Sequence, residues 1–142
     1  MSVTTRPYNP SDYESVTALY KQSELYGGQF DENRDSEERL TKKISDDSEA
    51  ILVVEEDGKI VGTVSLIEDG RVAWLFRFAV AKGNNEQEIA QALYNRAVEI
   101  LKSRGHKQVL VYSPTGDDFL AQRYESFGLT KGNEYTCYWK VI

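Results

Sequence analysis

The residues with the clearest chemical potential lie where an apolar run gives way to a polar loop and then to a helix. Phe76–Val80 is largely apolar, Ala81–Glu86 is short and polar, and Gln87–Lys102 has helical periodicity. The apolar residues of that helix share one face: Ile89, Leu93, Ala97, Ile100 and Leu101. The first N–H groups of a helix lack partners within it, and its dipole is positive there. The sequence therefore predicts an anion site at the start of this helix.

A second unit of the same kind follows. Val109–Tyr112 has the composition of a strand, Ser113–Gly116 that of a loop, and Asp117–Phe127 that of a short helix. A strand reached through a helical crossover is parallel to the strand before it. Parallel strands that diverge open a crevice at their carboxyl ends, and ligands bind there. We therefore expect a binding crevice between Phe76–Val80 and Val109–Tyr112.

The rest of the chain supplies the frame for these two units. One further helix is expected to begin at Pro10, with Ser11 and Glu14 as a capping box. Another is expected over Ser36–Ile44. The other expected strands are Val3–Arg6, Ala50–Glu55, Ile60–Ile67, Val72–Val80 and Tyr135–Val141. The predicted order is β-α-α-β-β-β-α-β-α-β. It is an α/β fold, with a mixed central sheet and helices on both faces, in one domain over residues 1–142.

Composition narrows the function classes. The chain has 142 residues, of which 17 are basic and 23 acidic, so its net charge is −6. This balance argues against nucleic-acid binding, which normally needs a basic face. No apolar run reaches the ~18 residues of a membrane span, and the first residues lack a secretory segment. One cysteine and one histidine make a disulfide impossible within the chain and a His/Cys metal site improbable. We expect a cytoplasmic protein with no metal, no membrane partner and no nucleic-acid partner.

The two successive strand-loop-helix units, together with the segment Tyr124–Leu129 (Tyr-Glu-Ser-Phe-Gly-Leu), resemble the GNAT superfamily of N-acetyltransferases. The resemblance covers nearly the whole chain. It implies the GNAT fold, acetyl-CoA as acyl donor, and a primary amine of a small molecule or peptide as acceptor. It also implies a monomer or a homodimer.

The family's cofactor loop reads Arg/Gln-x-x-Gly-x-Gly/Ala, and it binds the pyrophosphate of acetyl-CoA. Without a gap, those positions here are Asn85, Glu88 and Ala90, so only Ala90 matches. A gapped register would use Gln87 but would still lack both glycines. The ungapped register is preferred because it turns Ile89 toward the sheet. The resemblance assigns cofactor contacts to the loop and to the preceding strand, whose backbone binds the pantetheine arm: Phe78, Val80, Asn85, Glu86, Gln87, Glu88, Ile89 and Ala90.

Two acids at the helix start alter that site. Glu86 and Glu88 would repel a pyrophosphate, and each can itself occupy the helix end. The alternative interpretation is that both are ordinary acids of a first helical turn. We expect acetyl-CoA to bind more weakly here than to a relative that carries glycine.

In the family's pattern, a tyrosine of the last helix protonates the departing thiolate, and the resemblance gives this role to Tyr124. The alternative is that Tyr124 simply packs on the sheet. Asp117 is expected to cap that helix. The family often has an acid as general base on the strand before the cofactor loop, but Phe76 and Arg77 stand at those positions. The base is therefore expected to be water or the backbone.

The acceptor site implied by the resemblance involves Tyr26, Phe30 and Arg77. The two aromatic residues could line a pocket or join the first two helices. Arg77 could favour a substrate with a carboxylate, or it could lie on a solvent-facing edge. His106 is expected to be an exposed loop residue, and Cys137 a core residue of the last strand.

The leading interpretation is an acetyl-CoA-dependent N-acetyltransferase. One alternative is a non-catalytic GNAT-fold binding or regulatory module with weakened affinity for CoA, which Glu88 favours and Tyr124 opposes. A second alternative is an unrelated mixed α/β binding domain.

Overall fold

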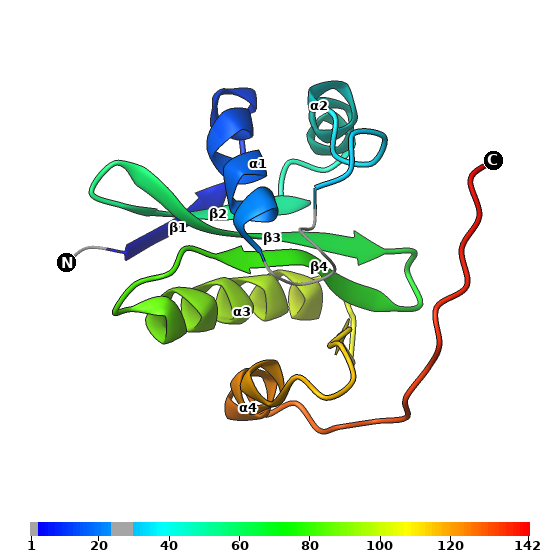
Figure 1. Cartoon of the computed structure of the whole chain (residues 1–142). Coiled ribbons are helices and arrows are strands. Elements are labelled where there is room, and N and C mark those ends of the chain that lie inside the picture. Colours follow the sequence, from blue (N-terminus) through cyan, green and yellow to red (C-terminus); the bar gives the residue numbers. More distant parts are fainter. Residues whose placement is uncertain (1–2, 24–29) are drawn as a thin grey trace. The chain divides into compact units, whose positions relative to one another are not determined.

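The computed structural model describes residues 3–23 and 30–142 (Figure 1). The described chain falls into two compact units, Met1–Val111 and Tyr112–Ile142. The first unit contains every strand of the described residues, and the second contains one helix.

The first unit is built on a five-stranded sheet in the order β1-β2-β3-β4-β5. Its strands are β1 (Val3–Pro7), β2 (Ile51–Glu56), β3 (Lys59–Glu68), β4 (Ala73–Val80) and β5 (Leu110–Val111). The first four pair antiparallel, and β5 pairs parallel with β4. The predicted meander, the crossover and the mixed sheet are confirmed. The strand predicted over Val109–Tyr112 is shorter than expected, since β5 spans only Leu110–Val111.

Helices cover both faces of this sheet (Figure 1). On one face, α3 (Glu86–Ser103) packs its predicted apolar stripe on residues of β2, β3 and β4, such as Leu52, Val64 and Leu75. On the other face, α1 (Tyr13–Gln22) and α2 (Glu37–Asp46) form a second core with Ile51 and Val53. The sheet is buried on both sides, as its β-branched strands require.

The first helical segment starts differently from the prediction. A short 3-10 turn, η1 (Pro10–Asp12), precedes α1, and Asn9 caps it. The Asn9 side chain accepts from the Ser11 N–H, and Asp12 accepts from the Asn9 N–H at 3.0 Å. The capping box thus uses Asn9 and Asp12 in place of Ser11 and Glu14. Ser11 cannot be the cap because it lies inside the turn.

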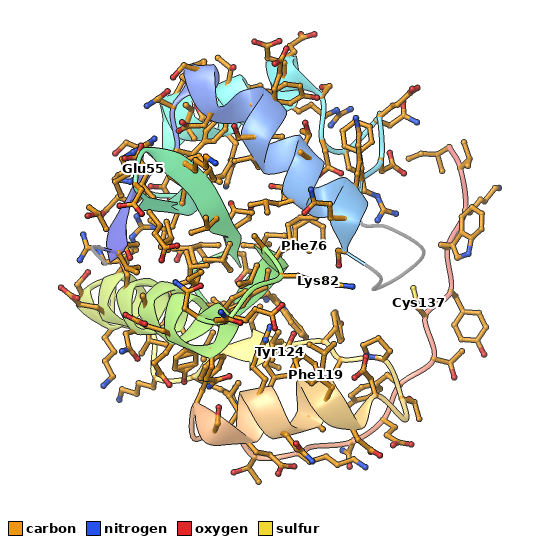
Figure 2. The ribbon with its side chains drawn as sticks, turned by 60° about the vertical axis from the view of Figure 1, so that its left-hand side comes forward. Glu55, Phe76, Lys82, Phe119, Tyr124 and Cys137 are labelled. Atoms are coloured by element: carbon orange, nitrogen blue, oxygen red, sulfur yellow. The ribbon has the colours of Figure 1, made fainter. Side chains whose placement is uncertain are left out.

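The second unit contains α4 (Asp118–Ser126). Asp117 caps it as predicted, accepting from the Leu120 N–H at 3.0 Å. The strand predicted over Tyr135–Val141 is wrong, since residues 129–142 form neither helix nor strand. Cys137 is accordingly exposed and not a core residue (Figure 2). Alternating apolar residues form a strand only where a neighbouring strand hydrogen-bonds to their backbone. The alternation itself does not show whether such a neighbouring strand is present.

Candidate functional site

The central strand β4 changes partners along its length. It pairs with β5 only at Trp74 and Leu75, and it continues to Val80 without that parallel partner. Its pairing with β3 is also interrupted, because β4 runs from Ala79 back to Phe76 while β3 advances only from Thr63 to Ser65. This extra residue is a β-bulge, and bulges occur often beside active sites. The second half of β4 therefore carries backbone groups outside a regular ladder.

Arg77 lies at this bulge with φ 52°, in the left-handed region that a residue with a long side chain rarely adopts. Such a conformation persists only when the surroundings hold it. The surroundings here are a buried ion pair: Arg77 Nε and Nη2 donate to the two carboxylate oxygens of Asp35 at 3.1 and 2.8 Å. The Arg77 and Asp35 side chains are only 8% and 4% exposed. The alternative of a solvent-facing Arg77 is therefore wrong.

Asp35 has further partners, one at its carboxylate and one at its backbone oxygen. The Asp31 N–H donates to Asp35 Oδ2 at 2.8 Å, and the Tyr13 hydroxyl donates to the Asp35 backbone oxygen at 2.8 Å. Sequence reasoning did not single out Asp35. Its only signal was its place just before Ser36, which caps α2, and a partner 42 residues away cannot be read from such a position.

Tyr20 of α1 lies beside this ion pair. The Arg77 guanidinium carbon is 5.8 Å from the Tyr20 ring centre, and 4.7 Å from the Phe76 ring centre. Burial raises the pKa of the Tyr20 hydroxyl, although contact with Ser65 works in the opposite direction. Tyr20 is therefore a neutral phenol at physiological pH and not a base.

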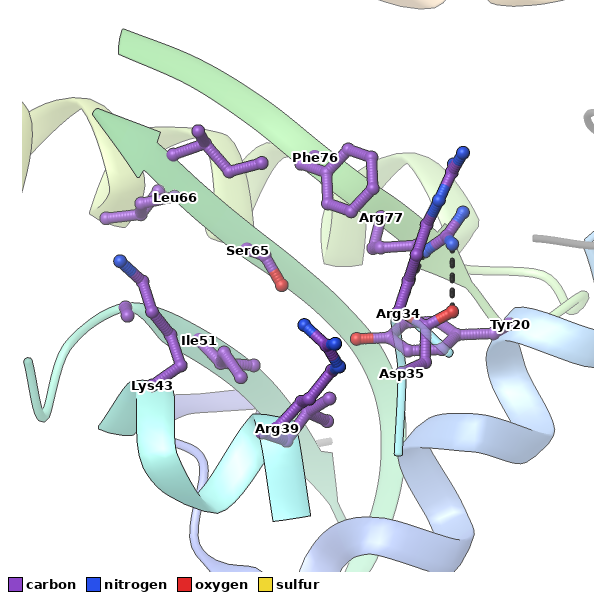
Figure 3. A pocket seen from close by; sticks show the side chains of 13 residues that line it. Tyr20, Arg34, Asp35, Arg39, Lys43, Ile51, Ser65, Leu66, Phe76 and Arg77 are labelled. Atoms are coloured by element: carbon purple, nitrogen blue, oxygen red, sulfur yellow. Dashed lines mark hydrogen bonds and ion pairs between the residues drawn. The ribbon is translucent and has the colours of Figure 1, made fainter. Parts of the chain in front are cut away.

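A cavity of about 220 Å³ opens above Tyr20, Ser65 and Phe76 (Figure 3). Its lining includes Arg77 with Asp35, and three further cations: Arg34, Arg39 and Lys43. Arg39 and Lys43 are one helical turn apart on α2 and project toward the strand of Ser65 in Figure 3. The sequence predicted a helix over Ser36–Ile44, but not that the cations of α2 face a cavity. The signal was available in the Arg39–Lys43 spacing.

The predicted cofactor loop lies at the far end of β4, between Val80 and the start of α3. Asn85 is the N-cap residue, yet its side chain does not cap the helix. Its amide instead donates to Glu56 Oε2, at the end of β2. Glu56 thus joins Glu86 and Glu88 as a third acid beside this loop. Sequence reasoning missed it, because Glu56 belongs to a hairpin 29 residues away.

The residues predicted to contact the cofactor divide into two groups. Ile89 and Ala90 bury their side chains, and the Ile89 N–H donates to the Asn85 oxygen at 3.0 Å, so both anchor α3 on the sheet. Gln87 and Glu88 are exposed, whereas Phe78, Val80, Asn85 and Glu86 are partly buried. The exposed Lys82 projects from the same loop (Figure 2) and is the loop's single cation, which sequence reasoning did not weigh.

The two aromatic residues predicted for the acceptor site have different outcomes. Phe30 packs against the core beneath α1 and α2, and the Lys21 ammonium lies 4.6 Å from its ring centre. This contact favours the interpretation in which Phe30 joins the helices. Tyr26 lies outside the described residues.

In the second unit, Tyr124 is 9% exposed, and its ring centre lies 6.5 Å from that of Phe127. The segment around it is a helix end. Gly128 has φ 93° and donates to the Glu125 oxygen, while the Leu129 N–H donates to the Tyr124 oxygen. This is a Schellman motif, in which the left-handed position favours glycine. The Tyr-Glu-x-x-Gly-Leu spacing thus fixes where the last turn of α4 places Tyr124.

His106 differs from its prediction. Its side chain is 7% exposed, and its Nε2 lies 3.3 Å from Glu68 Oε2. The turn after α3 folds back against β3, so His106 is a buried partner of Glu68 and not an exposed loop residue.

No group of three or more potential metal-binding side chains occurs within residues 3–23 and 30–142. In the same ranges, no helix is long and apolar enough to cross a membrane.

Comparison with known proteins gives the family. The model of the acetyltransferase (GNAT) family matches residues 13–128. Among solved structures, Ard1 from Thermoplasma volcanium is 18% identical, with 94% of this chain and 86% of that chain covered and a TM-score of 0.78. The PaiA N-acetyltransferase from Thermoplasma acidophilum, in complex with coenzyme A, is 20% identical, with 89% of both chains covered and a TM-score of 0.72.

A third similar structure is glucosamine-6-phosphate N-acetyltransferase from Arabidopsis thaliana. It is 18% identical, with 98% of this chain and 99% of that chain covered and a TM-score of 0.73. At these identities the structural likeness shows the fold. The family model matches most of the chain, and the chain therefore belongs to the GNAT acetyltransferase family.

Proposed function

We propose that this protein is an N-acetyltransferase that moves an acetyl group from acetyl-CoA to a primary amine of a small molecule or peptide, with residues 1–142 as one catalytic domain. The observation that carries the proposal is the course of β4. This strand leaves its parallel partner after Leu75, bulges at Arg77, and leads through a short loop into the start of α3.

The donor is assigned to the Val80 end of β4. Backbone groups of Phe78 and Val80 would bind the pantetheine arm, and Asn85, Glu86, Gln87 and Glu88 at the start of α3 would surround the pyrophosphate. A helix start binds anions through its backbone N–H groups whatever the side chains are. The similar PaiA structure, solved with coenzyme A, supports a CoA site in this fold.

The acceptor is assigned to the cavity on the α1 and α2 face, with Arg77 as a wall held by Asp35. The family resemblance also assigns Tyr26 and Phe30 to the acceptor, although Phe30 is not among the described residues that line the cavity. The attacking amine must be neutral. Among the described residues that line the cavity, Asp35 is the only carboxylate, and it is already bound by Arg77. Water therefore takes the proton. The surrounding cations help, because like charge lowers the pKa of a bound ammonium ion.

In the chemical step, the amine nitrogen attacks the thioester carbonyl, a C–N bond forms, and the C–S bond breaks. The departing thiolate needs a proton, and we assign its delivery to Tyr124. This assignment rests on the resemblance of Tyr124–Leu129 to the family's pattern and on the Schellman motif that fixes Tyr124 at the end of α4.

Calorimetric titration with acetyl-CoA tests the donor site. We expect binding that Glu88→Gly tightens, because it removes a charge and a Cβ from the phosphate path. Glu88→Gln is the matched variant that removes only the charge. If neither variant tightens binding, the pyrophosphate is not at this helix start.

Single-turnover acetylation tests Tyr124. Tyr124→Phe keeps the ring and should slow transfer by ~10²–10⁴-fold with unchanged affinity for acetyl-CoA, since that is the usual contribution of a general acid. Tyr138→Phe, at an exposed position of the same unit, is the control. A Tyr124→Phe protein that folds normally and keeps the full rate would reduce Tyr124 to a packing residue.

The pairing of Asn85 with Glu56 favours a second candidate function, a non-catalytic GNAT-fold module with weakened affinity for CoA. The three acids around the loop oppose a pyrophosphate, and Asn85 is engaged with one of them. Glu56→Gln separates the two candidates. If the native protein and this variant both fail to bind acetyl-CoA, the module is the better description.

A further inference from the structure

The cavity on the α1 and α2 face has a charge opposite to that of the whole protein. The chain carries a net charge of −6, yet the described residues that line this cavity include four cations and a single carboxylate. Dissolved salt screens the interaction between exposed charges over about 10 Å. The charges that line the cavity, and not the net charge of the protein, therefore decide which ligands the cavity attracts.

One cation is already neutralised. Both carboxylate oxygens of Asp35 accept from Arg77, and neither side chain is more than 8% exposed. The buried pair is therefore a neutral wall. It cannot bind a substrate anion without breaking a contact that the fold maintains.

The other three cations, Arg34, Arg39 and Lys43, make up what we call the cationic rim. Within residues 3–23 and 30–142 none of them forms a side-chain hydrogen bond or an ion pair. By contrast, the neighbouring Lys42 on α2 does not line the cavity and pairs with Asp46. In the described part of the chain, the three rim cations thus lack an ion-paired acid, although Arg34 and Lys43 feel the more distant carboxylates of Asp31 and Asp47.

The shape of the cavity adds to the charge. Its volume of about 220 Å³ suits a small polar molecule, and its floor includes the Ser65 hydroxyl and the Phe76 ring (Figure 3). Guanidinium groups bind carboxylates and phosphates through paired hydrogen bonds, and a lysine adds a point charge. The rim offers two guanidinium groups, from Arg34 and Arg39, and one ammonium group, from Lys43.

We infer that the acceptor amine carries an anionic group, a carboxylate or a phosphate, which Arg34, Arg39 and Lys43 bind. The inference rests on the proposed function, because it places the acceptor in this cavity. It moves the recognition of the anion from Arg77, where the sequence suggested it, to the rim.

The experiment compares small amines of similar length in acetyl transfer. β-Alanine carries a carboxylate, O-phosphoethanolamine a phosphate, ethanolamine no charge beside its amine, and putrescine a second amine. We expect kcat/KM at least about tenfold higher for an anionic amine than for ethanolamine, with putrescine poorest. The first two amines separate carboxylate recognition from phosphate recognition.

Arg39→Gln and Lys43→Gln should each lower kcat/KM for the anionic amine by about tenfold, the usual effect of one hydrogen bond to a charged group. Ethanolamine should be affected less than twofold. Lys42→Gln, on the same helix but outside the rim, is the matched control and should change neither. Equal rates with all four amines, or equal losses for charged and neutral amines, would overturn the inference.

A binding measurement keeps the inference separate from the proposed function. O-Phosphoethanolamine should raise the Tm of the native protein and raise it less for Arg39→Gln, whether or not acetyl is transferred. If no amine is acetylated but this shift is seen, the proposed function fails and the anion site remains. If amines are acetylated but no anionic amine raises Tm, the anion site fails and the proposed function remains.

Discussion

The two faces of the sheet are built on different principles. Under α3, the buried side chains of the sheet and the helix are all apolar, from Leu52 and Val54 to Leu93 and Ile100. Under α1 and α2, the core shares its face with a hydroxyl, a phenol and a buried ion pair between Asp35 and Arg77. The first face contributes stability through buried apolar area, whereas the second holds polar groups in fixed positions.

The difference teaches where this fold can bind a ligand. An apolar face closes wherever its side chains fit one another in shape, because none of its groups needs a specific polar partner. A face with polar groups closes only where each group finds a partner, since an unpaired buried charge is costly. Around Arg77 the partners are found, and the space they leave open is the cavity.

The largest expected effect breaks the polar face. Asp35→Asn leaves the buried Arg77 guanidinium without its counter-charge, and we expect a loss of about 3–5 kcal/mol in the free energy of unfolding. Urea denaturation measures it. Asp46→Asn, which removes the exposed partner of Lys42, is the control and should cost at most about 0.5 kcal/mol. An equal cost for the two variants would mean that the buried pair does not hold this face together.

The apolar face is tested by Leu93→Ala. Leu93 is fully buried among residues of both α3 and the sheet. Truncation removes transfer free energy and leaves a void, so we expect a loss of about 2–5 kcal/mol. The cost should not depend on salt, because no charge is involved. Denaturation at two salt concentrations checks this expectation.

The apolar face was also the easier one to predict from the sequence. The residues Ile89, Leu93, Ala97, Ile100 and Leu101 repeat at helical spacing, and all of them are buried. The strands of the meander were predicted to within a residue or two. Periodicity indicates which side of a helix or strand is apolar. That is enough to predict which residues are buried on an apolar face.

The polar face was predicted only in part. The sequence indicated Arg77 and the two helices, but not Asp35 or the direction of Arg39, and it likewise missed Glu56 beside the cofactor loop. The contacts of Asp35 and Glu56 each depend on a partner in a distant segment, and charge carries no periodic signal that would reveal the partner. The terminal strand failed for a related reason, since alternation at Tyr135 cannot show whether a neighbouring strand exists.

A smaller effect tests how closely α3 approaches the sheet. A Cβ added at Gly62 would lie 2.7 Å from Ile89 Cγ2 and 3.0 Å from Leu93 Cδ1. Gly62→Ala should therefore cost about 1–3 kcal/mol through overpacking. Adding Ile89→Ala should recover part of this loss, because it removes the clashing methyl, so the costs of the two changes should not add. Full additivity in urea denaturation would mean that the sheet moves instead.

The smallest expected effect concerns a partly exposed ion pair, which contrasts with the buried one at Arg77. Arg6 donates to the two carboxylate oxygens of Asp12 at 2.7 and 2.9 Å. The Arg6 side chain is 27% exposed, so water screens the pair. The hydrogen bonds from Arg6 hold the pKa of the Asp12 carboxyl below its ordinary value, although burial opposes them.

A lowered pKa in the folded state means that the unfolded chain binds a proton more readily. The stability from Asp12 is therefore present above the unfolded pKa of about 3.9 and is lost as pH falls through the lower folded value. Asp12→Asn should cost about 1 kcal/mol at pH 7, below the usual value for a bond to a charged group because of the screening. The gap to the native protein should close below pH 4, as urea denaturation across pH would show. A gap that stays constant with pH would mean that the loss does not come from the charge of Asp12, because an asparagine side chain can still accept the capping bond from the Asn9 N–H.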